Sequence, residues 1–201
     1  MKKFVQLYLF VFLFTLMPVS TAQFASKNAY YAQVSREYSV TFAGFIRATN
    51  PSVSVNDAIG IARRVVQYST EFDLNPFTML ALVATESTFK VNARSKYGAQ
   101  GLTQVVPRFH REKIDSAKRR FGTSDLSNPD VSLYVGAWVL REYMDSFKGN
   151  TTKALAKYKG ASNDPSRRLV KRVFSFQYAA QAFHERYASQ APMDQFINIM
   201  L

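Results

Sequence analysis

Glu86 is an ionisable side chain in an otherwise apolar stretch of the sequence. Leu82 and Val83 lie four and three positions before it, and Met79 lies seven before it, so a helix would place them on its face. A carboxyl among such neighbours loses hydration, which raises its pKa. General acids that work near neutral pH need this environment. The same local pattern also fits a glutamate near a helix end that is satisfied by backbone or solvent, and taken alone it favours that structural role.

The segment after Glu86 has no helical periodicity and carries a distinctive motif. It runs Glu86-Ser87-Thr88-Phe89, then Ala93 and Ser95, then Gly98-Ala99-Gln100-Gly101-Leu102-Thr103-Gln104-Val105, then Pro107. Glycines permit backbone conformations with positive φ and the close approach of a flat ring. A tight turn without a ligand would use the same glycines, so both interpretations of them stay open.

These motifs resemble the signature of the soluble lytic transglycosylase family, whose members are goose-lysozyme-like. Residues 128–130 and 136–140 are similar to a downstream family helix, and residues 154–158 to the start of its Ala-Tyr-Asn segment. The resemblance covers about residues 56–180. It implies a mainly α (α+β lysozyme-like) fold: a single helical domain with a small irregular or hairpin insert after the catalytic helix.

Carried over position by position, the resemblance implies that Glu86 is the catalytic acid. It implies that Gln104 and Tyr158 line the substrate, and that Ser87 and Ser95 are polar positions beside the cleft. The amide of Gln104 offers both a donor and an acceptor to an N-acetyl group. The expected substrate and partner is the peptidoglycan glycan strand, and no cofactor or metal is expected.

Five positions depart from the family pattern. The asparagine after the tyrosine is Lys159, and the following Ala-Gly order appears as Gly160-Ala161. The helix asparagine is Ser132 and the helix tyrosine is Trp138. These changes leave the acid untouched but alter the expected contacts around the sugar, and with them the chain-length or muropeptide preference.

The carboxylates bear on the type of reaction. Most glycosidases need two, one as acid and one as nucleophile or base, yet residues 87–111 contain neither Asp nor Glu. A lytic transglycosylase needs only one. The expected reaction is therefore cleavage of the MurNAc-GlcNAc β-1,4 bond with formation of 1,6-anhydroMurNAc, with Glu86 as acid and then base. The alternatives are a lysozyme-type hydrolase and a non-catalytic wall-binding component of a secretion or conjugation apparatus.

The elements that position Glu86 are predicted to be helices. Ser54 to Asp57 has the spacing of a capping box, and Asn75-Pro76 reads as the cap and first residue of the next helix, about 76–88. That second helix is apolar on most sides, which predicts burial. Further helices are expected over about 108–120, from Asn128, over 152–158 and from Asp164. The inward stripe expected for the last helix is Leu169, Val173, Phe176, Ala180 and Phe183.

The N-terminus predicts export. Lys2 and Lys3 precede a run of 14 mostly apolar residues, which Pro18 and small residues follow, as in a secretory signal cleaved near Ala22. A membrane anchor is the alternative, although a span needs about 20 residues. The expected divisions are a signal peptide (1–22), an N-terminal segment that could be helical (23–53), a catalytic domain (54–189) and a tail (190–201). Localisation is expected in the periplasm or cell envelope.

The net charge of +12 suggests an anionic partner. The basic clusters at 118–120, 167–168 and 171–172 lie in predicted helices whose other face is apolar, which favours solvated surfaces over specific nucleic-acid binding. His110 and His184 lie far apart in a chain without cysteine, so no metal-ligand spacing exists. A cell-envelope secretion or conjugation complex is a further candidate partner.

Overall fold

The computed structural model describes residues 36–160 and 167–188. The chain divides into two compact units, Met1–Arg36 and Glu37–Leu201, and the site lies in the second. The expected signal peptide, the cap at Asp164 and the C-terminal tail fall outside the described residues. Residues 37–49 are helical, and Phe42 and Phe45 are buried there. This range lies within the N-terminal segment for which a helix is expected.

Two capped helices bring the chain to Glu86, and both begin where the sequence predicts. α3 spans Val55–Glu71, and the hydroxyl of Ser54 accepts a hydrogen bond from the backbone N–H of Asp57. α4 spans Pro76–Ser87, and the side chain of Asn75 accepts from the N–H groups of Phe77 and Thr78. Side-chain oxygens at this position satisfy donors that have no partner within the helix.

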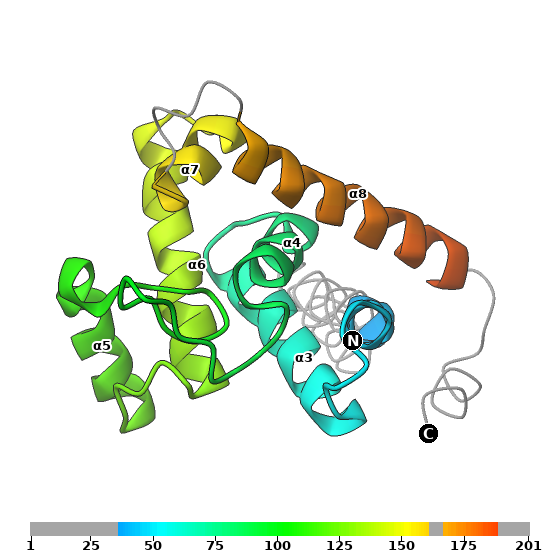
Figure 1. Ribbon diagram of the computed structural model, residues 1–201, viewed down its shortest axis with the longest axis horizontal. Helices are drawn as coiled ribbons and strands as arrows, with labels where there is room; N and C mark the ends of the chain where they lie inside the picture. The colour runs from blue at the N-terminus through cyan, green and yellow to red at the C-terminus, as the bar shows by residue number, and fades with distance from the viewer. Residues whose placement is uncertain (1–35, 161–166, 189–201) are drawn as a thin grey trace, which may run out of the picture. The chain divides into compact units, whose positions relative to one another are not determined.

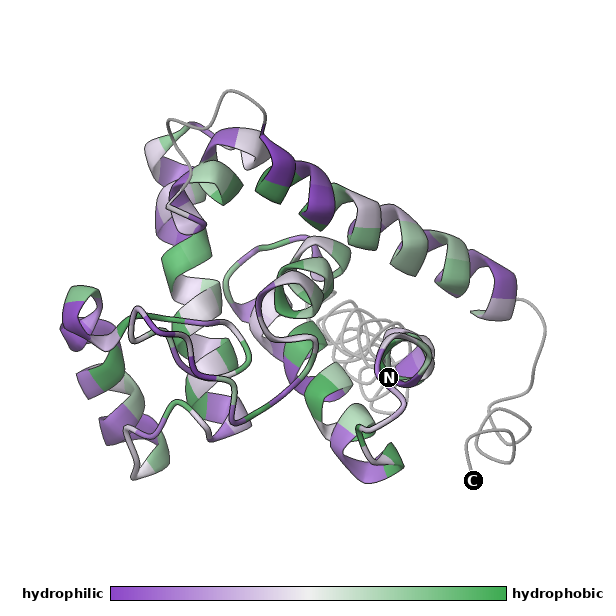
Figure 2. Cartoon of the chain, in the orientation of Figure 1, coloured by the Kyte–Doolittle hydropathy of each residue, from purple (hydrophilic) through white to green (hydrophobic). Residues whose placement is uncertain are grey.

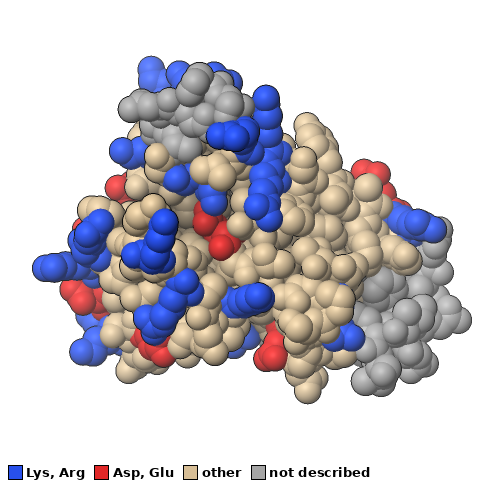
Figure 3. Space-filling model, in the orientation of Figure 1, with Lys and Arg blue, Asp and Glu red and all other residues tan. Residues whose placement is uncertain are grey.

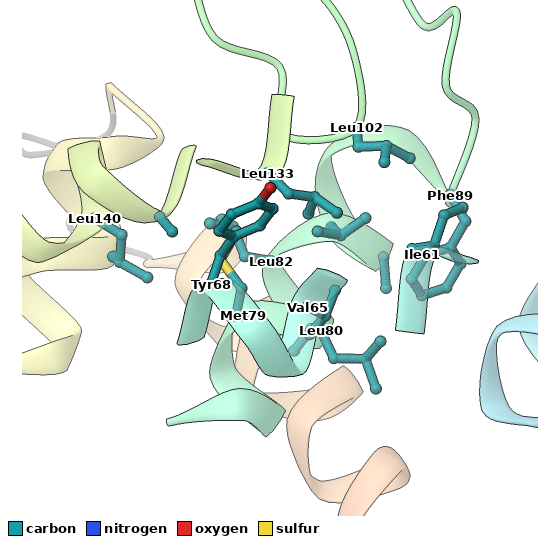
Figure 4. Packing of buried hydrophobic residues seen from close by; sticks show 14 of the residues in the cluster. Ile61, Val65, Tyr68, Met79, Leu80, Leu82, Phe89, Leu102, Leu133 and Leu140 are labelled. Carbon is teal, nitrogen blue, oxygen red and sulfur yellow. The ribbon is translucent and has the colours of Figure 1, made fainter. Parts of the chain in front are cut away.

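α4 is buried on nearly all sides, as its composition predicts. It packs most extensively against α8, which spans Arg168–Ala188, and it also contacts α3 (Figure 1). Figure 4 shows the side chains of Met79, Leu80 and Leu82 among apolar side chains from neighbouring elements. All three are fully buried. Burying a side chain of this size stabilises the fold by about 1.5–3 kcal/mol, so α4 is a rigid support for the residues at its end.

The segment that follows α4 is an irregular insert, as expected. Within the described ranges 36–160 and 167–188, β-pairing is limited to two isolated bridges, Arg94 with Gln100 and Gln100 with Val105. Gly101 has φ +75°, and a Cβ there would lie 2.0 Å from the carbonyl oxygen of Leu126. Only glycine fits at that point, because the backbone is left-handed and the space is already filled.

The remaining helices surround this centre. A 3₁₀ turn, η1 (Pro107–Phe109), precedes α5 (Arg111–Phe121), so the basic helix begins about three residues later than expected. α6 (Pro129–Ser146) is capped by Asn128, and α7 (Thr151–Tyr158) by Asn150. α6 contacts α3, α5 and α7. The fold is mainly helical, which confirms the predicted class. Within the described residues, no helix is both long and apolar enough to cross a membrane.

The prediction that Leu169 of α8 faces the core is wrong. Leu169 is 39% exposed, whereas the adjacent Val170 is buried. The buried positions of the helix are Val170, Val173 and Ala180, so the inward stripe at its start is shifted by one residue. Figure 2 shows mixed polar and apolar colouring along α8, with a hydrophilic stretch near its beginning. A spacing of three to four residues before Val173 allows either Leu169 or Val170 to face inward, and packing against α4 selects Val170.

Candidate active site

Glu86 lies in the last turn of α4, one residue before the helix ends. The helix stops because Thr88 adopts a left-handed conformation with φ 50°, and its carbonyl accepts a hydrogen bond from the side-chain amide of Asn50 at 2.7 Å. Met79 and Leu82 are fully buried, and the Glu86 side chain is only 12% exposed. Burial raises the pKa of Glu86 above its ordinary value, as the sequence predicts.

Lys159 is a partner of Glu86 that sequence reasoning missed. Its Nζ donates a hydrogen bond to Oε1 of Glu86 at 2.7 Å, and its side chain is 10% exposed. Burial is the largest influence on the pKa of Glu86, and the charge and hydrogen bond of Lys159 lower that pKa, so they offset part of the effect. The sequence did show a lysine in place of the family's asparagine, but no neighbouring residue indicated where the side chain of that lysine would point.

Tyr158 precedes Lys159 and contacts the insert. Its hydroxyl donates a hydrogen bond to the carbonyl oxygen of Thr103 at 2.9 Å. Burial, followed by the negative charge of Glu86, raises the pKa of Tyr158 far above its usual range. Tyr158 is therefore a neutral hydrogen-bond donor that joins the end of α7 to the insert in the electrostatic neighbourhood of Glu86.

Thr103 in turn is held by α6. Its Oγ1 donates a hydrogen bond to the carbonyl of Ser132 at 2.8 Å, and its N–H donates to the hydroxyl of Ser132 at 3.2 Å. A Cβ on Gly136 would lie 2.5 Å from the Thr103 side chain. Ser132, noted above as a departure from the family pattern, therefore anchors the insert, and Gly136 allows the close approach.

Gln104 organises the insert from within. It adopts φ 51°, and its amide nitrogen donates to the carbonyls of Ala93 at 3.0 Å and Gly101 at 2.9 Å. Both amide hydrogens are thus engaged by the backbone. The part of Gln104 left for a sugar is its amide oxygen, an acceptor, rather than the donor and acceptor pair that the sequence suggested.

The two serines also make local contacts. Ser87 is buried, and its hydroxyl donates to the carbonyl of Val83 at 3.2 Å. The hydroxyl of Ser95 accepts from the N–H groups of Tyr97 and Ala99. Among the five predicted site residues, Glu86 acts on Tyr158 through its charge, and Gln104 follows Thr103, whose carbonyl Tyr158 binds. The serine hydroxyls shape the backbone around this group.

Three carboxylates further along the chain are candidates for a second catalytic group: Asp130, Glu112 and Asp125. Asp130 accepts two hydrogen bonds from the guanidinium of Arg64, at 2.8 and 2.9 Å, and one from Tyr68. Burial would raise the pKa of Asp130, but these bonds outweigh it and hold the pKa below the usual range. Glu112 and Asp125 are exposed. In the described part of the chain, no group of three His, Asp or Glu side chains could hold a metal ion.

A pocket of about 400 Å³ lies against the segment that follows α4. It is lined by Asn50, Ser52, Val53, Asp57, Ile61, Phe89, Lys90, Val91, Asn92 and Ala93. Figure 3 shows lysine and arginine side chains spread over the visible face, chiefly in the areas of α5 and of the end of α7. Most of the charged side chains visible on this face are therefore basic.

Comparison with known proteins places this geometry in a family. The family model described as the transglycosylase SLT domain matches residues 64–178. A transglycosylase of Enterobacteria phage PRD1 is 30% identical over 95 residues, which are 47% of this chain and 32% of the phage protein. The chain therefore spans about a third of that relative's length.

A solved structure of another transglycosylase is also similar to this chain. It is an inactive glutamate-to-glutamine mutant of the lytic transglycosylase Slt from Pseudomonas aeruginosa, with a TM-score of 0.51 and 25% identity. The match covers 64% of this chain and 24% of that one. It confirms the mainly α, lysozyme-like fold. Because the family model matches more than half of the sequence, this chain belongs to the transglycosylase SLT domain family.

Proposed function

We propose that this protein is a lytic transglycosylase that cleaves the MurNAc-GlcNAc β-1,4 bond of peptidoglycan glycan strands and leaves a 1,6-anhydroMurNAc end. The observation that carries the proposal is the nearly buried Glu86 carboxyl at the end of α4, next to an insert that bears the family motif. The inactive mutant of the Pseudomonas enzyme, in which a glutamate is replaced by glutamine, supports an essential carboxyl in that relative.

The reaction uses one carboxyl twice. Protonated Glu86 donates its proton to the glycosidic oxygen while the bond from that oxygen to C1 breaks. The acetamido oxygen of the substrate stabilises the positive charge that develops at C1. Glu86, now a carboxylate, then removes the proton of the 6-hydroxyl, whose oxygen forms the new bond to C1. Glu86 ends protonated again, and no water is added.

The carboxylates favour this route over hydrolysis. A retaining or inverting hydrolase places a second carboxylate roughly 5–9.5 Å from the acid. Residues 87–111, which follow Glu86 directly, contain none, and the Asp130 carboxylate is held by Arg64 and Tyr68. Burial raises the pKa of Glu86, which suits it to donate a proton.

Mass spectrometry of the products tests the proposal. The protein is incubated with purified peptidoglycan without added metal or cofactor, and Glu86→Gln serves as the control. Anhydro-muropeptides should appear with the wild type only. Products one water heavier would identify a lysozyme-type hydrolase. Binding without any cleavage by the wild type would identify a wall-binding protein instead.

A further inference from the structure

The ion pair between Glu86 and Lys159 is the feature of the site that the family resemblance does not supply. The two side chains are 12% and 10% exposed, and Nζ and Oε1 lie 2.7 Å apart. Among the described residues, Oε1 alone of the two carboxyl oxygens accepts a hydrogen bond. The pair therefore directs Oε1 toward α7 and leaves Oε2 as the oxygen that can face a glycosidic bond.

The backbone around Lys159 fixes the direction of its side chain. Lys159 is the C-cap of α7, and its N–H donates to the carbonyl of Leu155 at 3.0 Å. The preceding Tyr158 is tied to Thr103, and the following Gly160 has φ +63°. Lys157, two residues earlier on the same helix, is exposed. Contacts of the residues on both sides thus hold the position of Lys159. Lys157 is an exposed lysine on the same helix, so it serves as the matched control position.

The charge of Lys159 matters because Glu86 must change its protonation state. The first step needs the protonated acid, and the second needs the carboxylate. A buried carboxyl without a counter-ion favours the protonated form, and a nearby ammonium favours the ionised one. A neutral asparagine at this position could donate a hydrogen bond but could not supply the charge.

We propose that Lys159 is a positioning residue for the reaction, an internal counter-ion that orients the Glu86 carboxyl and sets the pH range in which Glu86 acts as the acid. This inference rests on the proposed function, since it assigns Lys159 a part in the chemistry of Glu86. Lys159 touches the carboxyl and acts on the substrate through it.

Other ionisable groups around α4 do not supply this charge. On α3, Arg64 is bound to Asp130; on α8, Lys171 and Arg172 are exposed. In the segment after α4, Lys90, Arg94 and Lys96 are exposed as well. Tyr158 is neutral, because burial and the charge of Glu86 raise its pKa. Within the described residues, Lys159 is the cation whose field and hydrogen bond act on the pKa of Glu86.

The test compares the pH dependence of kcat/KM for the wild type, Lys159→Gln, Lys159→Arg and Lys157→Gln. The substrate is a set of glycan oligomers released from peptidoglycan, and anhydro-product is measured. Removing the Lys159 charge should move the alkaline limb to higher pH by about 1–3 pH units, because Glu86 stays protonated longer. Lys159→Arg keeps the charge, and Lys157→Gln removes an exposed one, so both should leave the limb close to wild type.

A second readout does not depend on activity. Infrared difference spectra between each protein and its Glu86→Gln counterpart follow the carboxyl band of Glu86 through a pH titration. The midpoint should be higher in Lys159→Gln than in the wild type. If Lys159→Gln fails to fold, Lys159→Met, which keeps the apolar stem, takes its place in both measurements.

The outcomes separate this inference from the proposed function. If Glu86→Gln is inactive but the alkaline limb and the infrared midpoint are unchanged by loss of Lys159, the positioning role is wrong and the function stands. A uniform loss of kcat at every pH with an unmoved limb shows a merely structural lysine and also overturns the inference. If Glu86→Gln keeps wild-type activity, the proposed function itself fails.

Discussion

The hydroxyl of Tyr158 donates a hydrogen bond to the backbone carbonyl of Thr103, 55 positions earlier in the chain, at 2.9 Å. Thr103 is bound in turn to Ser132 of α6, so this contact connects the end of α7, the insert and α6. Lys159 follows Tyr158 directly and reaches Glu86. The position of the counter-ion of Glu86 therefore depends on how the insert is held.

Tyr158→Phe should lower stability. The change leaves the carbonyl of Thr103 without this donor in a buried place, which costs about 1–3 kcal/mol. Urea unfolding of the variant against wild type measures the difference. Tyr178→Phe on α8 is the matched control, because Tyr178 is 68% exposed, and it should stay within about 0.5 kcal/mol of wild type. Equal stability of both variants would contradict the connecting role of Tyr158.

Glu86→Gln should abolish turnover, with a loss of at least about 100-fold, the low end of what general acid–base catalysis contributes. The variant retains the shape of the side chain and an oxygen that can accept from Lys159, but it has no proton to transfer. Activity close to wild type would remove Glu86 as the catalyst.

The same variant should show a defined pH dependence of stability. Because the folded-state pKa of Glu86 is raised, the folded protein binds more protons than the unfolded chain in the window from the unfolded pKa, about 4.3, up to the folded pKa. Stability of the wild type therefore falls relative to Glu86→Gln as pH rises through that window. Melting temperatures of both proteins from about pH 4 to 8 test this; an opposite slope would mean that Lys159 outweighs burial.

Gly101→Ala should destabilise more than Gly98→Ala. Both glycines have positive φ, +75° and +85°, so both substitutions incur the backbone strain of about 1–2 kcal/mol. Only at Gly101 would the new Cβ meet an atom, the Leu126 carbonyl oxygen at 2.0 Å, whereas nothing lies within 4 Å at Gly98. The difference in free energy of unfolding between the two variants isolates the clash. An equal loss of stability in the two variants would show that the backbone near Leu126 shifts to make room for the new Cβ.

We propose that the protein is exported and that its mature form begins near Gln23. The basic residues Lys2 and Lys3, the short apolar run and the small residues around Ala22 form the order of a cleavable signal. N-terminal sequencing of protein recovered from the periplasm checks this. Recovery of residues 4–14 in membrane fractions, attached to the rest of the chain, would indicate an anchor.

The sequence by itself determined the features that depend on neighbours within a few positions. Ser54, Asn75 and Asn128 marked three helix starts, because a capping side chain bonds to N–H groups two or three residues ahead. The burial of Glu86 was also predictable. Its apolar neighbours recur at helical spacing, and a helix that is apolar on nearly every side is buried in the core.

Only the tertiary structure decided the contacts between distant segments. Lys159 lies 73 positions from Glu86, and its direction follows from how α7 ends and where the insert holds Tyr158. The donors of Gln104 turn inward because the insert's own carbonyls need partners. The first inward residue of α8, Val170 rather than Leu169, follows from the packing of that helix on α4. In each case long-range packing chooses among arrangements that the local pattern allows equally.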